Sequence, residues 1–150
     1  MPYQDLVLGH RFGVFFFIGG VVPNPLDIRF KRVSGLSGTI NTIDLREGGQ
    51  NTYTHKLPDG ISHDNLVLER GMVVGSPLNV EVNVALSLYA MTPSNVMITL
   101  FNESSIPIGA WLCIKAFPVR WSTSDLDASE GSVVIDTFEL AYTRLQVLRI

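Results

Sequence analysis

Three histidines and one acidic turn are the residues whose types could bind a metal ion. His55 and His63 are separated by a proline-glycine turn, and His10 lies far from both in the sequence. No cysteine or paired carboxylate stands beside them at the spacing of metal ligands. Since a zinc site needs three or four ligands on rigid elements, we predict no metal site and interpret His55 and His63 as solvated loop residues.

The acidic residues Asp125, Asp127 and Glu130 lie close together in one turn, where calcium binding is conceivable. The glycine and the ligand order of an EF-hand loop are missing from this segment. We therefore interpret it as a solvated, helix-capping turn.

Signatures of catalysis and of cofactor binding are also missing from the sequence. No nucleophile-elbow pattern supports a Ser-His-Asp triad, although a triad is spatial and the sequence leaves it open. The segment 46–49 and the pair at 19–20 lack the pattern of a phosphate-binding loop. Cys113 lies in the apolar stretch WLCIKAF and, as the single cysteine, cannot form an internal disulfide. We predict no catalytic residue, no cofactor, and a buried, inert thiol at Cys113.

The composition indicates one domain, residues 1–150, that covers part of its surface with a partner. Hydrophobic residues make up 46% of the 150 residues and charged residues only 17%, against about a quarter in an average protein. A chain with so little charge often buries surface against a partner. The net charge of −3 argues against a general nucleic-acid binder, which needs a basic face.

The apolar run FGVFFFIGGVV, residues 12–22, has the length of a signal-peptide core. The residues before it are not basic, those after it offer no cleavage site, and the run is too short to span a bilayer. We therefore predict a buried strand, no membrane anchor, and a protein that is made and folded in the cytoplasm.

Alternation of apolar and polar residues predicts antiparallel strands at 26–33, 95–101, 110–121 and 135–143. Pro118 in the third segment is allowed only at a sheet edge or a bulge. In the fourth segment, Phe138, Leu140 and Tyr142 share one face, and small or polar residues form the other. Turn residues separate the segments, so the expected fold is mainly β, a sandwich or barrel of antiparallel sheets.

Residues 76–91 fit two structures. Almost perfect alternation from Leu78 to Leu88 favours a strand slightly. The same residues form a helical stripe, and Ser76 followed by Pro77 would begin a helix well. The stripe consists of Leu78, Val82, Ala85, Leu86 and Tyr89.

The polar stretch DLREGGQNTYTHKLPDG, residues 44–60, interrupts the apolar pattern. It is either a catalytic loop, an arm that reaches for a partner, or a merely solvated loop.

Several stretches, in order, resemble the tail tube proteins of contractile phages and contractile injection systems, including the inner-tube subunits of phage-tail-like particles. The resemblance covers about residues 13–145. The stretches that carry it are FxxVSGL at 30–36, REGGQN at 46–51, LPDG at 57–60, LVLERG at 66–71, SPL at 76–78, VMITLFNE at 96–103, AWLCIKAFPVRW at 110–121 and SVVIDTFELAY at 132–142.

The resemblance implies two packed antiparallel β-sheets, barrel-like, with one flanking helix that begins near Ser76. It implies a structural subunit without enzymatic activity. Six subunits would form a homohexameric ring, and the rings would stack into a hollow tube that is driven through a target envelope. The implied partners are further copies of the chain, a sheath protein, baseplate or tube-initiator and terminator proteins, and a cargo protein or DNA in the lumen.

The resemblance also makes the polar stretch an extended hairpin that contacts neighbouring subunits and the next ring. Two glycines would permit tight geometry at its base. The residues expected at these contacts are Arg46, Glu47, Gly48, Gly49, Asn51, Tyr53 and His55. The expected lumen face is Thr137, Glu139, Ala141 and Thr143, which Asp27, Arg29 and Lys31 could share.

A monomeric β-sandwich that binds a carbohydrate or protein ligand is the alternative, and a hydrolase on the same fold comes third. Trp111, Trp121 and Tyr142 would be the residues that stack on a sugar. Self-association with six-fold closure distinguishes the tube subunit from both.

Overall fold

The computed structural model describes residues 11–17, 29–46, 48–49, 52–73, 76–89 and 93–149. The described chain is mainly β, with one helix, as expected. In order, the elements are β1 (Phe12–Phe17), β2 (Arg32–Ser34), β3 (Thr39–Leu45), β4 (His55–Ser62), β5 (Leu66–Gly71), α1 (Pro77–Leu88), β6 (Ser94–Phe101), β7 (Pro107–Thr123), β8 (Ile135–Ala141) and β9 (Arg144–Arg149).

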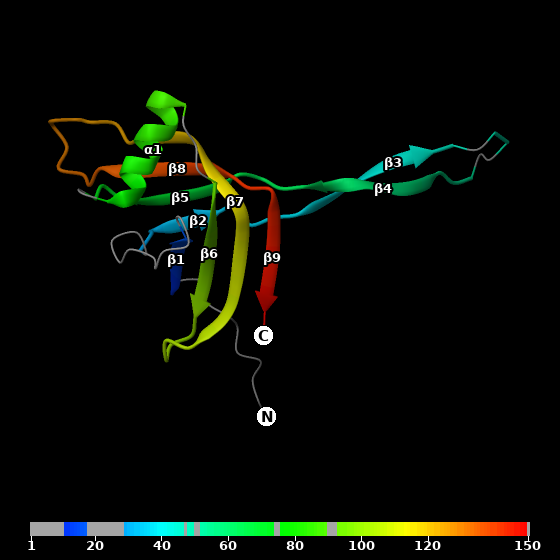
Figure 1. The fold of residues 1–150 in the computed structure, drawn as a ribbon, viewed down its shortest axis with the longest axis horizontal. Coiled ribbons are helices and arrows are strands. Elements are labelled where there is room, and N and C mark those ends of the chain that lie inside the picture. The colour runs from blue at the N-terminus through cyan, green and yellow to red at the C-terminus, as the bar shows by residue number, and fades with distance from the viewer. Residues whose placement is uncertain are drawn as a thin grey trace.

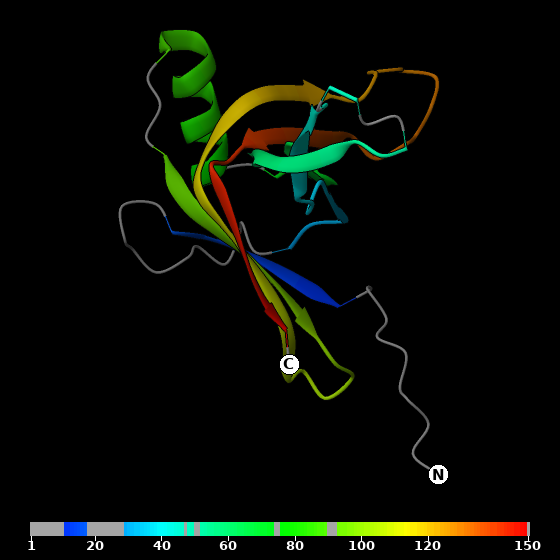
Figure 2. The same cartoon turned by 90° about the vertical axis from the view of Figure 1, so that its right-hand side faces the viewer.

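The long strand β7 belongs to two antiparallel sheets. Its first part pairs with β6 on one side and β9 on the other, and its second part pairs with β8. One sheet is therefore β1-β6-β7-β9 and the other is β7-β8-β5-β2. Figure 2 shows β7 curving from one sheet into the other. Among the described strands, β1 and β2 are the two ends of the strand order and do not pair with each other, so the barrel is open.

Two features allow β7 to change direction. Lys115, with φ 55°, stands where pairing passes from β6 and β9 to β8. The register with β8 then shifts between Pro118 and Arg120, which marks a bulge. Since proline cannot donate to the ladder and bulges bend a strand, the prediction that Pro118 needs an edge or a bulge is confirmed.

The core lies between the sheets and the helix. Alternation works as expected in β8, where Phe138 and Leu140 are buried and their neighbours are half-buried. The partner residues Leu66 and Leu68 of β5 are fully buried. Together these strands present a continuous apolar layer, which the other core residues extend. These residues are Val14, Phe16, Phe30, Leu78, Val82, Val96, Ile98, Cys113, Ala116 and Tyr142.

Residues 76–89 form a helix, so the expectation from resemblance is confirmed and the interpretation from alternation is wrong. Ser76 is an extended N-cap whose hydroxyl accepts from the Leu78 amide at 3.2 Å, and Pro77 occupies the first turn. The buried stripe is narrower than predicted. It includes Leu78, Val82 and Ala85, whereas Leu86 and Tyr89 are exposed.

The start of α1 is held by a buried arginine on β5. The Arg70 guanidinium donates to Ser76 Oγ at 2.9 Å and to Asn79 Oδ1 at 3.2 Å. It also lies over the rings of Phe30 and Phe138, about 5 Å from each centroid. Cation–π contacts and charged hydrogen bonds in a buried setting tie the helix to the sheet.

Two predicted strands lie only partly within the described residues. In the described part of the predicted 26–33, strand β2 begins at Arg32, while Phe30 is buried and Lys31 donates from its amide to the Glu69 carbonyl. In the described part of the predicted 12–22, residues 12–17 form β1. Residues 18–28 lie outside the described residues.

Among the residues that the structure describes, no helix is long and apolar enough to cross a membrane.

We predict that Cys113 does not react with a thiol reagent until the protein unfolds. Its side chain is fully buried, and burial raises its pKa to about 12 from an ordinary value of 9.0. The thiolate is the reactive form, so at pH 8 the native protein should show no reaction with Ellman's reagent. In guanidinium chloride one thiol per chain should react, and rapid reaction of the native protein would contradict the buried position.

Candidate functional site

An arm formed by β3 and β4 projects from the body as a separate two-stranded sheet (Figure 1). Its register runs from Thr39 opposite Ser62 to Leu45 opposite His55. The arm is therefore longer than the polar stretch 44–60 that predicted it. The expected extended hairpin is present, and it is regular strand over most of its length.

The two glycines were expected at the base of the arm, but they lie at its far end. Gly48 and Gly49 form the turn between β3 and β4, and Gly49 has φ 89°. Closer to the body, the register shifts between Ile40 and Thr42, and Gly60 on the opposite strand has φ 81°. This irregularity is a bulge, which increases the twist of the hairpin.

Every strand residue of the arm is exposed, including its large apolar side chains. Ile40 stands opposite Ile61, and Ile43 stands opposite Leu57; these residues are 42–65% exposed. Ile40 and Ile43 are three positions apart on one strand, so they point to opposite faces. A two-stranded hairpin is marginal alone, and exposed apolar patches mark interaction surfaces. The exposed apolar side chains therefore make the arm a candidate contact surface.

The predicted contact residues divide between described and undescribed positions. Arg46 directly follows β3 and is exposed. The Tyr53 and His55 rings meet edge to face with centroids 5.1 Å apart. His55 is the first residue of strand β4, so its interpretation as a loop residue is wrong. Glu47 and Asn51 lie outside the described residues.

His63 lies in a loop, as expected, but it is not fully solvated. It is half-buried at the base of the arm, and its Nδ1 lies 2.7 Å from the Ser37 carbonyl oxygen. Its ring lies against Tyr142, with centroids 5.1 Å apart. Tyr142 is only 9% exposed, and its hydroxyl donates to backbone carbonyls. A buried, hydrogen-bonded tyrosine cannot stack on a sugar, so the platform of Trp111, Trp121 and Tyr142 does not form.

The residues predicted to line a lumen lie on the side of β8 and its continuation away from the core. Thr137, Glu139 and Ala141 are half-buried, and Thr143 is exposed. Glu139 accepts from Asn65 Nδ2 at 2.9 Å, and Thr143 donates to the Ile114 carbonyl. Arg29 and Lys31 are exposed, and Asp27 lies outside the described residues.

Several strand edges are unpaired within the described chain. β2 pairs only with β5, β1 pairs only with β6, and β9 pairs only with β7. The second part of β7 pairs with β8 on one side alone. Open edges expose backbone donors and acceptors that another chain can pair with. Like the arm, these edges point to assembly.

The acidic turn caps itself rather than a helix, so the helix-capping interpretation is wrong. Asp127 accepts from the Ser129 amide at 2.9 Å and from its hydroxyl at 2.6 Å, and these bonds lower the pKa of Asp127. A strand follows the turn. In the described part of the chain, no three His, Cys, Asp or Glu residues are grouped to hold a metal.

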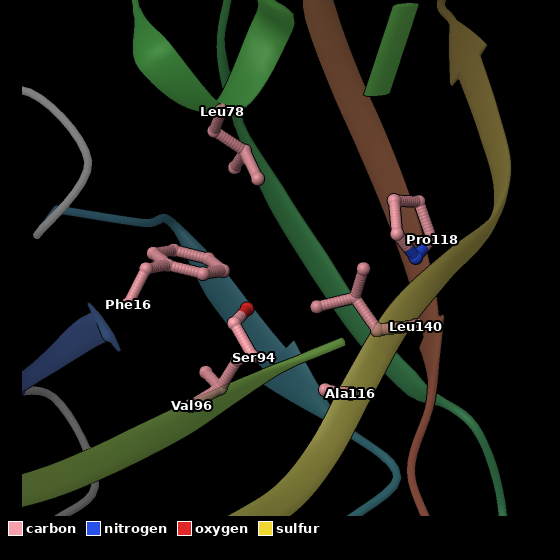
Figure 3. Close-up of a pocket in the computed structure, with 7 residues that line it drawn as sticks. All are labelled: Phe16, Leu78, Ser94, Val96, Ala116, Pro118 and Leu140. Atoms are coloured by element: carbon pink, nitrogen blue, oxygen red, sulfur yellow. The ribbon is translucent and has the colours of Figure 1, made fainter. Parts of the chain in front are cut away.

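The cavity in Figure 3 is a gap in packing rather than a ligand site. Its volume is about 10 Å³, room for about one water. Its lining is largely apolar and comes from α1 and from strands of both sheets. The lining residues are Phe16, Leu78, Ser94, Val96, Ala116, Pro118 and Leu140.

Comparison with known proteins agrees with this geometry. The sequence profile of the T4-like virus tail tube protein gp19 matches residues 9–146. A chain in the 6-fold symmetrised cryo-EM structure of the anti-feeding prophage (AFP) baseplate is 40% identical, with 98% of both chains covered and a TM-score of 0.89. No curated protein sequence matches the chain.

Two more distant structures share the fold. A chain in the cryo-EM structure of the sheath-tube complex of PVC, an extracellular contractile injection system, in its extended state is 23% identical. The alignment covers 98% of this chain and 94% of that chain, with a TM-score of 0.81. Hcp1 from Flavobacterium johnsoniae is 10% identical. The alignment covers 91% of this chain and 93% of the Hcp1 chain, with a TM-score of 0.58.

We predict that Gly35→Ala destabilises the fold by about 2 kcal/mol or more, because φ is 90° and an added Cβ would lie 1.9 Å from the Asn65 carbonyl oxygen. Gly48→Ala is the control, since a Cβ there meets nothing within 4 Å. Urea unfolding followed by circular dichroism measures both. Equal stability of the two variants would contradict the close approach at Gly35.

Proposed function

The chain belongs to the T4-like virus tail tube protein family, and we propose that it is the repeating subunit of the inner tube of a contractile tail or injection system. Members of this family are structural tube proteins. We accordingly propose no enzymatic activity for this chain.

The observation that carries the proposal is a protein surface built for partners. Every strand residue of the projecting arm is exposed, including the apolar side chains of Ile40, Ile43, Leu57 and Ile61. In the described chain, β1, β2 and β9 each leave one edge unpaired. Both the arm and these edges would be covered in a tube.

Rings of identical subunits fit these surfaces. The arm and the edges are different patches, so contact between them is head-to-tail, and head-to-tail contacts close into rings or extend into filaments. The 40% identical relative comes from a structure described as 6-fold symmetrised, which supports a homohexameric ring. We propose that the arm then contacts the neighbouring subunit and the next ring through Arg46, Glu47, Gly48, Gly49, Asn51, Tyr53 and His55.

The lumen is proposed to be lined by Thr137, Glu139, Ala141 and Thr143. This face lies away from the core, and its single charge is negative. A neutral or acidic wall would let DNA pass without sticking, and it also suits a protein cargo.

The proposed partners follow from the assemblies in which the similar chains occur. Their structures are described as a baseplate, a sheath-tube complex, a tube-terminating cap and a sheath/tube terminator. We propose corresponding contacts with sheath, baseplate and terminator proteins. Assembly would take place in the cytoplasm, into a phage tail or a phage-tail-like particle.

We predict that shortening the arm abolishes stacking and leaves the fold intact. Replacement of residues 44–56 by Asn-Gly joins Ile43 to Leu57, which stand opposite each other, through a two-residue turn. No core residue is lost, so circular dichroism and the unfolding transition should stay close to wild type. Negative-stain microscopy should show stacked tubes for wild type and single rings or subunits for the variant.

Leu126→Ala, which keeps the arm and changes an exposed side chain in the turn between β7 and β8, is the control and should form normal tubes. Tubes of normal length from the shortened variant would show that the arm does not join the rings. Wild-type protein that stays monomeric even with its baseplate present would overturn the tube assignment itself.

A further inference from the structure

The base of the arm is where two segments, distant from the arm's tip, meet the end of β8. Residues 35–38 lead into β3, and residues 63–65 lead out of β4. Gly35 lies so close to the outgoing segment that an added Cβ would be 1.9 Å from the Asn65 carbonyl oxygen. The two segments therefore touch at the point where the arm leaves the body.

The Tyr142 hydroxyl bonds to the incoming segment. It lies 2.9 Å from the Gly35 carbonyl oxygen and 3.3 Å from the Ser37 carbonyl oxygen, so its one proton is shared between them. Gly35 also accepts from the Ser37 amide at 3.0 Å, which tightens this turn. Burial raises the pKa of Tyr142, so the hydroxyl keeps its proton and remains a donor at neutral pH.

His63 joins the outgoing segment to the same point. The Ser37 carbonyl can only accept, so His63 Nδ1 carries the proton in the 2.7 Å bond. The His63 ring lies on the Tyr142 ring at an interplanar angle of 36°. The Asp64 amide donates to Ser37 Oγ at 3.3 Å, and Asn65 donates to Glu139 on β8.

We infer that Tyr142 and His63 are positioning residues that clamp both segments at the base of the arm to the body. The clamp fixes the direction of the arm before a neighbouring subunit is met. This inference rests on the proposed function for its purpose, since it concerns how the arm is presented for assembly.

Geometry explains why such a clamp matters. Within the described residues, β3 and β4 pair only with each other, so strand pairing with the body does not restrain the arm's direction. A seven-residue strand spans about 23 Å, so a tilt of about 10° at the base moves the tip by about 4 Å. An error of that size removes the contacts at the tip. A fixed base lowers the ordering cost of association.

The test compares Tyr142→Phe and His63→Ala with two controls. Tyr89→Phe removes the same atom from an exposed tyrosine at the end of α1, away from the arm. His63→Asn keeps a donor near the position of Nδ1 and should behave as wild type. In each background, Lys56→Cys on β4 and Val147→Cys on β9 carry spin labels, both at exposed positions. The native Cys113 is fully buried and takes no label.

Pulsed dipolar spectroscopy on unassembled subunits then measures the distance between arm and body. Tyr142→Phe and His63→Ala should broaden the distance distribution, while circular dichroism shows an intact body. Their assembly threshold should rise by about fivefold or more, the effect of losing one hydrogen bond of about 1 kcal/mol. Both controls should keep a narrow distribution and the wild-type threshold.

A narrow, unchanged distribution in both Tyr142→Phe and His63→Ala would overturn the clamp. A broadened distribution with an unchanged threshold would overturn its role in assembly. The distance measurement uses single subunits, so it stands even if the wild-type protein forms no tube. Failure of the proposed function is thereby separated from failure of the clamp.

Discussion

The hydrogen bonding of β7 is the constraint on which the rest of the structure depends. One strand belongs to both sheets, pairing with β6 and β9 through its first part and with β8 through its second. The change of partners at Lys115 and the bulge at Pro118 set the angle between the sheets. Because β5 and β2 are added through β8, and β1 through β6, every strand of the body takes its place from this one.

The helix completes the core that this arrangement leaves open. Leu78 and Val82 fill the space beside the sheets, and Arg70 holds the helix start through Ser76 and Asn79. A buried guanidinium is expensive to desolvate, and here two aromatic rings and two polar side chains surround it. The directional hydrogen bonds to Ser76 and Asn79 fix where the start of the helix lies against the sheet.

Local patterns could be read from the sequence wherever one face of a strand is buried. The alternation around Phe138 predicted the core side of β8 because a period of two permits only one assignment of faces. The helix was harder, since apolar residues stand at every second position from Leu78 to Leu88, while Leu78, Val82 and Ala85 also form one helical stripe. Ser76 and Pro77 favoured the start of a helix, alternation slightly favoured a strand, and the resemblance to tail tube proteins predicted the helix that is present.

Features that depend on contacts between residues distant in the sequence could not be predicted from it. Pro58 and Gly60 lie inside a strand that their residue types argue against, because β4 is an exposed ribbon and not a central strand. The hydrogen bond between Tyr142 and Gly35 joins residues 107 positions apart, and no local sequence pattern predicts it. His63 was taken as solvated for the same reason: its partner Ser37 lies on the other side of the whole arm.

The division of the chain into a body and an arm separates two physical tasks. The body buries the core and is stable by its own packing, whereas every strand residue of the arm is exposed and adds nothing to that core. The arm's apolar side chains are therefore free to serve contacts between subunits without weakening the fold. This freedom requires that the arm be held at its base, because a surface that binds in a fixed geometry must itself be presented in one. The bonds of Tyr142 and His63 lie at the boundary between the two tasks, where one strand of the core ends and the arm begins.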